Sequence, residues 1–180
     1  MESTAYNATR ESTSFRGYSA AQKERGIDSG VINRLLYAAM SAPAPLQYLP
    51  WKFIAITDRP TLGLLANRLP FAAKLSRAVA DIVVCAVVQD ALMENEAMAV
   101  INCTCASQNI ILTAQAMGYS TAWTSLYPDE GNMNTVREML QIPAHVIPLN
   151  ILPLVESGYN EKAKSKYDAG SIFREKWNKH

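Results

Sequence analysis

The amino-acid sequence predicts a three-layer domain of the α+β or α/β class, in which a sheet lies between layers of helices. Apolar residues at helical spacing alternate along the chain with short runs rich in β-branched and aromatic residues. The longest helical pattern, residues 94–117, is apolar on both faces, which is typical of a helix buried on more than one side. The apolar run at 82–88 has the length of a buried strand.

The N-terminal half contains two helical patterns, each followed by a strand pattern. The expected elements, in chain order, are a partly extended polar stretch (1–26), a helix (29–40), a strand (51–57), a helix (60–68) and a helical or irregular stretch (74–78). Ser29 is of the type that caps the first helix, and Pro60 suits the first turn of the second. The buried strand at 82–88 follows.

The C-terminal half begins with the long helical pattern, for which Gly118 is a natural C-cap. The elements expected after it are a strand (119–124), a turn (128–130), a short helix (134–140) and a strand (146–155). Pro148 and Pro153 interrupt the last strand, which makes it hard to place at the centre of a sheet. The charged residues 158–180 are expected to leave the body of the domain.

Composition excludes several classes of function. The 180 residues, expected to form one domain, are 49% hydrophobic and 18% charged with a net charge of +1, so charge gives no reason to expect binding to nucleic acid or an anionic membrane. No run approaches a transmembrane span. Residues 1–9 are polar, are expected to be flexible, and lack the apolar core of a signal peptide. We therefore expect a cytoplasmic protein.

Neither a metal centre nor a catalytic triad is expected. Cys85, Cys103 and Cys105 are too few and odd in number for a disulfide framework, so buried or half-buried free thiols are predicted. The only histidines are His145 and His180, and neither lies near a cysteine in sequence. No glycine-rich dinucleotide or phosphate loop is present. An enzyme with so few acid–base groups usually takes its chemistry from a cofactor.

A proline-rich loop at 41–53 joins the first helix to the first strand. Such a loop can hold a flat ligand at little entropic cost, although local physics alone favours a plain connector. Three other segments offer polar contacts: the arginines and hydroxyls at 10–16, the strand end at 122–128 and the alternate lysines at 162–167. Each of these, taken alone, is equally typical of a solvated surface.

Taken in order, these segments resemble the nitroreductase family of flavin mononucleotide (FMN) enzymes. The resemblance rests on the start at 10–16, the loop at 42–53 with Pro50-Trp51-Lys52-Phe53, and the segments 106–112 and 118–123. It covers residues 10–177 and implies a three-layer α/β/α fold with a central, mostly antiparallel sheet. It also implies an intertwined homodimer, in which residues 158–180 pack on the partner subunit.

The resemblance implies a role for each matching residue. Ser14 would contact the phosphate or ribityl oxygens, and Arg16 and Lys74 would lie near the flavin pyrimidine edge. Backbone N–H groups around Thr124 and Ser125 would face flavin N5 or O4. The full set of implied cofactor-binding residues is Arg10, Ser14, Arg16, Pro43, Ala44, Pro45, Gln47, Lys74, Thr124, Ser125, Lys164 and Lys166.

The implied function is an FMN-dependent oxidoreductase in which no side chain acts as a catalytic nucleophile. NADH or NADPH would pass hydride through flavin N5, in a ping-pong sequence, to an electron-poor acceptor such as a nitroaromatic, quinone or enone. The chain departs from the family pattern at Ser12, Thr13, Gln47, Leu49 and Asn102. These departures leave two alternatives: a non-catalytic flavin- or ligand-binding dimer on the same fold, and an unrelated α/β domain with chance similarity.

Overall fold

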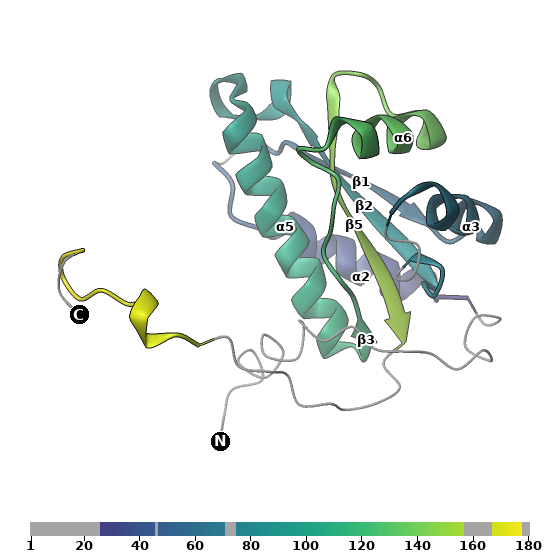
Figure 1. Cartoon of the computed structure of the whole chain (residues 1–180), viewed down its shortest axis with the longest axis horizontal. Helices are drawn as coiled ribbons and strands as arrows, with labels where there is room; N and C mark the ends of the chain where they lie inside the picture. The colour runs from purple at the N-terminus through teal and green to yellow at the C-terminus, as the bar shows by residue number, and fades with distance from the viewer. Residues whose placement is uncertain (1–25, 46, 71–74, 157–166, 178–180) are drawn as a thin grey trace.

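The computed structural model describes residues 26–45, 47–70, 75–156 and 167–177. The longer helices are α2 (Ser29–Met40), α3 (Arg59–Arg68), α5 (Glu96–Ala116) and α6 (Glu130–Leu140), and the single-turn 3₁₀ helices are η2 (Val88–Asp90), η3 (Leu92–Glu94) and η4 (Ala169–Ser171). The strands are β1 (Trp51–Ile56), β2 (Ala80–Val87), β3 (Tyr119–Ser120), β4 (Thr124–Ser125) and β5 (Val146–Glu156). The five strands form one sheet, and Figure 1 shows its long strands β1, β2 and β5 with helices on both sides.

The sheet has the order β1-β2-β5-β3, and β4 pairs with β5 beside β3. All pairs are antiparallel, which confirms the expected α+β architecture with a mostly antiparallel sheet. β2 and β5 lie at its centre, and their side chains are buried along almost the whole of both strands. A strand buried on both faces reads as a continuous apolar run, as the sequence of β2 does.

The side-chain alternation of β2 assigns residues to the two faces of the sheet. Helices α2 and α5 pack on one another, and Ser107 of α5 is hydrogen-bonded to Asn150 of β5. Val84 lies opposite Asn150 and therefore shares the face that α5 covers. Asp81 is an odd number of residues from Val84 and faces the other side, where α3 and α6 pack (Figure 1).

Aspartates cap the N-termini of α2, α3 and α6. The Asp28 side chain accepts a hydrogen bond from the Gly30 N–H, so Asp28 caps α2 and the expected cap, Ser29, is its first residue. Asp58 caps α3, and Pro60 lies in the first turn of that helix, as predicted. Asp129 caps α6, and this helix therefore begins at Glu130, earlier than the predicted 134.

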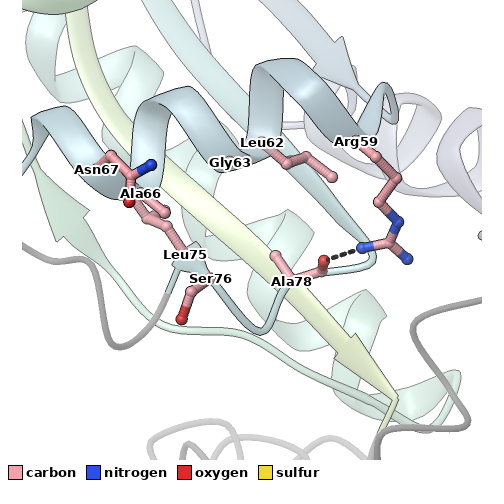
Figure 2. A pocket seen from close by; sticks show the side chains of 8 residues that line it. All are labelled: Arg59, Leu62, Gly63, Ala66, Asn67, Leu75, Ser76 and Ala78. Carbon is pink, nitrogen blue, oxygen red and sulfur yellow. Dashed lines mark hydrogen bonds between the residues drawn. The ribbon is translucent and has the colours of Figure 1, made fainter.

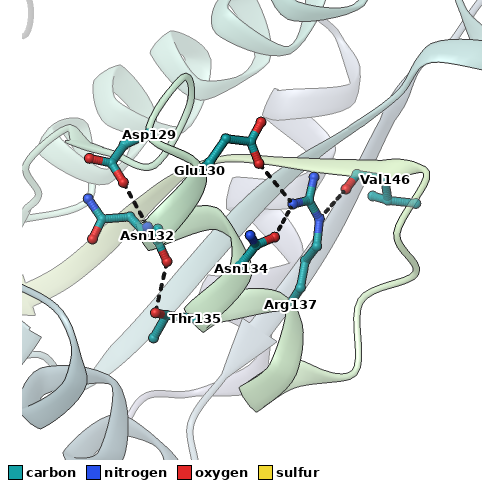
Figure 3. Close-up of polar contacts among 8 residues, drawn as sticks. Asp129, Glu130, Asn132, Asn134, Thr135, Arg137 and Val146 are labelled. Atoms are coloured by element: carbon teal, nitrogen blue, oxygen red, sulfur yellow. Dashed lines mark hydrogen bonds and ion pairs between the residues drawn. The ribbon is translucent and has the colours of Figure 1, made fainter.

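Helix α6 is held against the end of β5 by Arg137. Its guanidinium donates from Nε to the Val146 carbonyl at 3.2 Å and from Nη1 to Asn134 Oδ1 at 2.8 Å (Figure 3). Glu130 lies 3.8 Å away and is mostly exposed. The short helix is thus anchored chiefly by the hydrogen bonds from Arg137 to two neutral acceptors. Solvent weakens these bonds less than it weakens an exposed ion pair.

The expectation that prolines exclude the last strand from the sheet centre is wrong, because β5 is central. A proline is costly in a strand only where its missing N–H would meet a partner. Pro148 lies at the bulge between β2 and β5, two residues beyond the last β4 pair at Asn150. Pro153 lies alongside the unpaired residues 121–123. Both prolines therefore occupy gaps in the hydrogen-bond ladder.

The predicted strand at 119–124 is split in two for the same reason. Tyr119 and Ser120 form β3, and Thr124 and Ser125 form β4. Both pieces keep the same register against β5, so the segment runs beside that strand throughout. Pairing fails at 121–123, where the neighbouring Pro153 has no N–H to donate.

Helix α5 confirms the long helical pattern. It is capped by Asn95 and begins at Glu96, two residues later than predicted. It ends at Ala116, and Gly118 follows with a positive φ of 81°, a conformation that glycine adopts without strain. Its length and mean hydropathy of 1.3 meet the general test for a membrane span, contrary to the expectation from the sequence. Its apolar side chains pack against α2 and the sheet, which accounts for that hydropathy in a core helix.

Burial governs the chemistry of the two core thiols. Cys85 and Cys103 are buried and Cys105 is half-buried, all three as free cysteines, as predicted. Burial raises the pKa of Cys85 and of Cys103 to about 12. The Cys103 thiol donates a long hydrogen bond of 3.6 Å to the Cys85 carbonyl. Both therefore stay protonated and act as small apolar side chains of the core.

Candidate functional site

The proline loop leaves α2 at Ser41 and enters β1 at Trp51. Pro43 is exposed, Ala44 and Pro45 are half-buried, and the Tyr48 N–H donates to the Pro45 carbonyl at 2.8 Å. At the far end, the Pro50 carbonyl accepts from the Val87 N–H of β2 at 2.7 Å. The loop is thus stiffened by its prolines and tied to the sheet where it enters β1.

The start of the loop is tied to α5. Asn102, only 5% exposed, donates from Nδ2 to the Pro43 carbonyl at 3.1 Å. Its Oδ1 is buried and accepts no hydrogen bond from a described residue. Asn102 was singled out in the sequence only as a departure from the family pattern, and its contact with the loop was missed.

Thr124 and Ser125, the two predicted residues outside the loop that the structure describes, form strand β4. The Thr124 side chain is buried, and its Oγ1 has no hydrogen-bond partner within the described part of the chain. Ser125 is exposed and accepts from Trp123 Nε1 at 2.9 Å. Because β4 pairs only with β5 among the described strands, alternate backbone groups point away from the sheet.

This combination fits a flavin in its chemistry. A flat ring packs against small apolar residues such as Pro43, Ala44 and Pro45, while its N5 and carbonyl oxygens take hydrogen bonds from backbone N–H groups. The Thr124 hydroxyl is buried without a hydrogen-bond partner among the described residues, a state that costs free energy. Gln47 is exposed on the same loop. No hydrogen bond joins the loop to β4 among the described residues.

Six predicted site residues lie outside the described residues. They are Arg10, Ser14, Arg16, Lys74, Lys164 and Lys166. The cationic side chains assigned to the phosphate and to the pyrimidine edge are all in this group. Their assignment therefore remains a prediction.

A cavity of about 530 Å³ lies between α3 and residues 75–78, and no described residue of the proline loop lines it. Figure 2 shows Leu62, Ala66 and Leu75 around it, with Arg59 at one end, where Nη1 donates to the Ala78 carbonyl at 2.9 Å. Among the described residues of the predicted cofactor-binding set, none lines it. No sequence motif marks this cavity, because it arises from the packing of one helix against an irregular segment.

Asp81 is a buried acid that sequence reasoning overlooked. Its side chain in β2 is 0% exposed, and neither carboxylate oxygen has a hydrogen-bond partner in the described structure. Burial raises the pKa of Asp81 to about 7. The sequence signal was a single charged residue at the start of an apolar run, which is equally typical of an exposed strand end.

Similar proteins identify the fold. The model of the nitroreductase family matches residues 72–153. A protein of Methanothermobacter thermautotrophicus named "Putative NADH dehydrogenase/NAD(P)H nitroreductase" is 32% identical over 155 residues, which is 86% of this chain and 80% of that protein. A crystal structure with the same name from Parabacteroides distasonis is 32% identical, with a TM-score of 0.86 over 98% of this chain and 100% of that one.

A further solved structure, from Desulfovibrio desulfuricans, is named as a putative nitroreductase in complex with FMN. It is 20% identical, has a TM-score of 0.79, and covers 98% of this chain and 99% of its own. At that identity the likeness concerns the fold, and it agrees with the architecture described above. The identity to the archaeal relative, over most of both chains, carries the family assignment. This chain belongs to the nitroreductase family.

Proposed function

We propose that this protein is an FMN-dependent oxidoreductase that uses NADH or NADPH as its electron donor. The observation that carries the proposal is its membership of the nitroreductase family, whose members include a structure named as an FMN complex. The proline loop and the outward edge of β4 add a rigid apolar wall and backbone donors suited to a flavin ring. This function fits a chain with few acid–base groups.

The proposed site uses the loop as a wall and basic residues as the phosphate grip. Pro43, Ala44, Pro45 and Gln47 flank the ring and ribityl chain, and backbone N–H groups around Thr124 and Ser125 face flavin N5 or O4. The residues proposed for the phosphate and pyrimidine edge are Arg10, Ser14, Arg16, Lys74, Lys164 and Lys166. A guanidinium such as that of Arg16 favours the negative charge that develops near N1 and O2.

When bound, FMN would supply the redox chemistry, receiving hydride at N5 from the nicotinamide and passing it to a nitroaromatic, quinone or enone acceptor. The described residues of the site, Pro43, Ala44, Pro45, Gln47, Thr124 and Ser125, have no ionisable side chains. Their contribution is therefore to bind, orient and exclude water rather than to move protons. An open face of the ring would serve the donor and the acceptor in turn.

We also propose that the enzyme is a homodimer. Tyr37 (80% exposed) and Met40 on α2, and Ile101 on α5, are large apolar side chains left open to solvent on adjacent helices. Leu49 of the proline loop is also exposed. Such residues gain free energy when a second subunit covers them. Residues 158–180, with Trp177 exposed, are proposed to pack on the partner subunit.

A cytoplasmic location without membrane or nucleic-acid partners completes the proposal. The net charge of +1 gives no electrostatic reason to bind either surface. The apolar helix α5 contacts α2, β1, β2, β3 and β5, so its hydropathy serves the core.

Reconstitution with FMN tests the proposed function. The purified protein is mixed with FMN, and NADH or NADPH oxidation is followed with a quinone as the acceptor. Sustained turnover that depends on both FMN and the acceptor is expected, with parallel double-reciprocal lines for a ping-pong sequence. Saturable FMN binding without turnover would instead support the non-catalytic dimer. A monomeric protein that shows no saturable FMN binding would contradict both.

A further inference from the structure

The proline loop has few ways of being held in place. Pro43, Pro45 and Pro50 have no N–H to donate, so at these three positions only the carbonyl oxygen can take part in a backbone hydrogen bond. The Pro50 carbonyl pairs with β2 at the start of the first strand, and the Pro45 carbonyl is used within the loop by the Tyr48 N–H. The Pro43 carbonyl is the third proline carbonyl of the loop.

Asn102 of α5 binds that carbonyl. Its Nδ2 donates to the Pro43 carbonyl at 3.1 Å, between residues 59 apart in sequence. Among the described residues, this is the hydrogen bond that joins the segment 43–45 to another element. The Asn102 Oδ1 is buried and accepts no hydrogen bond from a described residue. The amide therefore contributes to this contact only through its donor, Nδ2.

Asn109 makes a comparable bond with a different target. It lies two turns further along the same face of α5, and its Nδ2 donates to the Ala38 carbonyl at 3.0 Å. Ala38 belongs to the last turn of α2, and its carbonyl already accepts from the Ser41 N–H. Asn109 therefore supports a helix end that has other hydrogen bonds, whereas Asn102 holds a loop segment that has few.

We propose that Asn102 is a positioning residue of the flavin site, which fixes the segment 43–45 on helix α5 so that it can pack against the ring. The proposal rests on the proposed FMN function. Without the bond, the loop samples other positions. FMN binding then has to order the loop, and this entropic cost lowers the affinity. Asn102 itself need not touch the cofactor for this effect.

The test is FMN affinity, measured by titrating the flavin-free full-length chain and following FMN fluorescence and visible absorption. Asn102→Leu keeps the side-chain size and removes the donor, and the expected result is a rise in Kd of about tenfold, equivalent to one hydrogen bond. The matched control, Asn109→Leu, removes a comparable bond to α2 and is expected to change Kd less than about twofold. Equal effects of the two variants would overturn the proposal.

A second variant separates positioning from a general loss of structure. In Asn102→Asp, the acid can donate to the Pro43 carbonyl only when it is protonated. The introduced carboxyl would be buried, which raises its pKa above the usual value of about 4. The ratio of its FMN Kd to that of the wild type is therefore expected to rise with pH as the carboxyl ionises, over a titration from about pH 4 to about pH 8. A ratio independent of pH, with circular dichroism showing a folded protein, would contradict the proposal. Wild-type protein that binds no FMN would overturn the proposed function as well, whereas unchanged binding in Asn102→Leu would overturn only this inference.

Discussion

On the α2–α5 face of the sheet, Asn150 donates to Ser107 and Asn102 donates to the Pro43 carbonyl. On the α3–α6 face, Asp81 is buried with neither carboxylate oxygen hydrogen-bonded to a described residue. The first face therefore uses buried polar groups to fix elements that are far apart in sequence. The second face buries a group that stabilises the fold only when it is neutral.

This difference shows why burial alone does not mark the proposed flavin site. Asp81 is more deeply buried and has a strongly raised pKa, yet none of the predicted site residues lies beside it in the sheet register. Asn102 does not titrate, and its importance comes from the loop to which it is bonded. The proposed site therefore rests on the contact that positions the proline loop and not on the perturbed pKa of an isolated acid.

The largest expected effect is on the pH dependence of stability through Asp81. Its pKa is about 7 in the folded protein against 3.8 as the reference value, so the folded state binds more protons between these values. The stability due to neutral Asp81 is complete below pH 3.8 and is lost as pH rises through 7. The loss amounts to roughly 4 kcal/mol.

Asp81→Asn removes this titration and is expected to raise the free energy of unfolding by about 2 kcal/mol at pH 8, since an unpaired buried amide still costs some stability. Urea unfolding of both proteins from pH 4 to pH 8 measures the difference. Carboxylates with lowered pKa, such as Asp58 and Asp168, contribute equally to both proteins and cancel. A difference that does not change with pH would show that Asp81 keeps its charge in the fold.

Ser107 gives the next largest effect, on the opposite face. Ser107→Ala leaves the buried Asn150 amide without the acceptor that lies 3.0 Å from its Nδ2. The expected loss is about 1–3 kcal/mol of unfolding free energy, measured with urea. Thr104→Ala is the control, because Thr104 is exposed and its hydroxyl bonds only to the Val100 carbonyl of the same helix. Equal losses in the two variants would mean that Asn150 gains little from Ser107.

Arg137 is expected to have a smaller effect on the α3–α6 face. Arg137→Met keeps the length of the aliphatic stem and removes the bonds to the Val146 carbonyl and Asn134, at an expected cost of about 1 kcal/mol in thermal unfolding. Glu130→Gln weakens only the exposed ion pair at 3.8 Å and should leave the midpoint nearly unchanged. A larger effect of Glu130→Gln would contradict the anchoring described for α6.

The smallest expected effect concerns Lys52 and Asp90, which form a 2.8 Å ion pair next to the start of β1. Both side chains are largely exposed, so Lys52→Gln should cost less than about 0.5 kcal/mol. Raising the salt concentration should reduce even this difference, because ions screen exposed charges. A loss of unfolding free energy that stays the same at high salt would show that the Lys52–Asp90 contact stabilises the fold by more than exposed charge attraction.

Local signals were enough to predict the helices at 29–40 and 60–68, which the structure has at Ser29–Met40 and Arg59–Arg68, since caps and apolar periodicity act over a few residues. The central place of β5 could not be predicted, because its prolines are tolerated only through gaps in neighbouring strands. The loop of the site was likewise visible in the sequence. Its tether to Asn102 was not, since no local pattern links residues 59 apart.

The most direct test of the account asks on which side of the sheet FMN binds. The flavin-free wild type and the flavin-free variant Gly63→Leu are each titrated with FMN. Gly63 lines the α3 cavity and a Cβ there would meet nothing within 4 Å, so the leucine side chain is chosen to occupy that cavity. The account predicts saturable binding of about one FMN per chain in both proteins, with Kd values within about twofold. Absence of saturable binding in the wild type, or its loss in Gly63→Leu alone, would contradict the account.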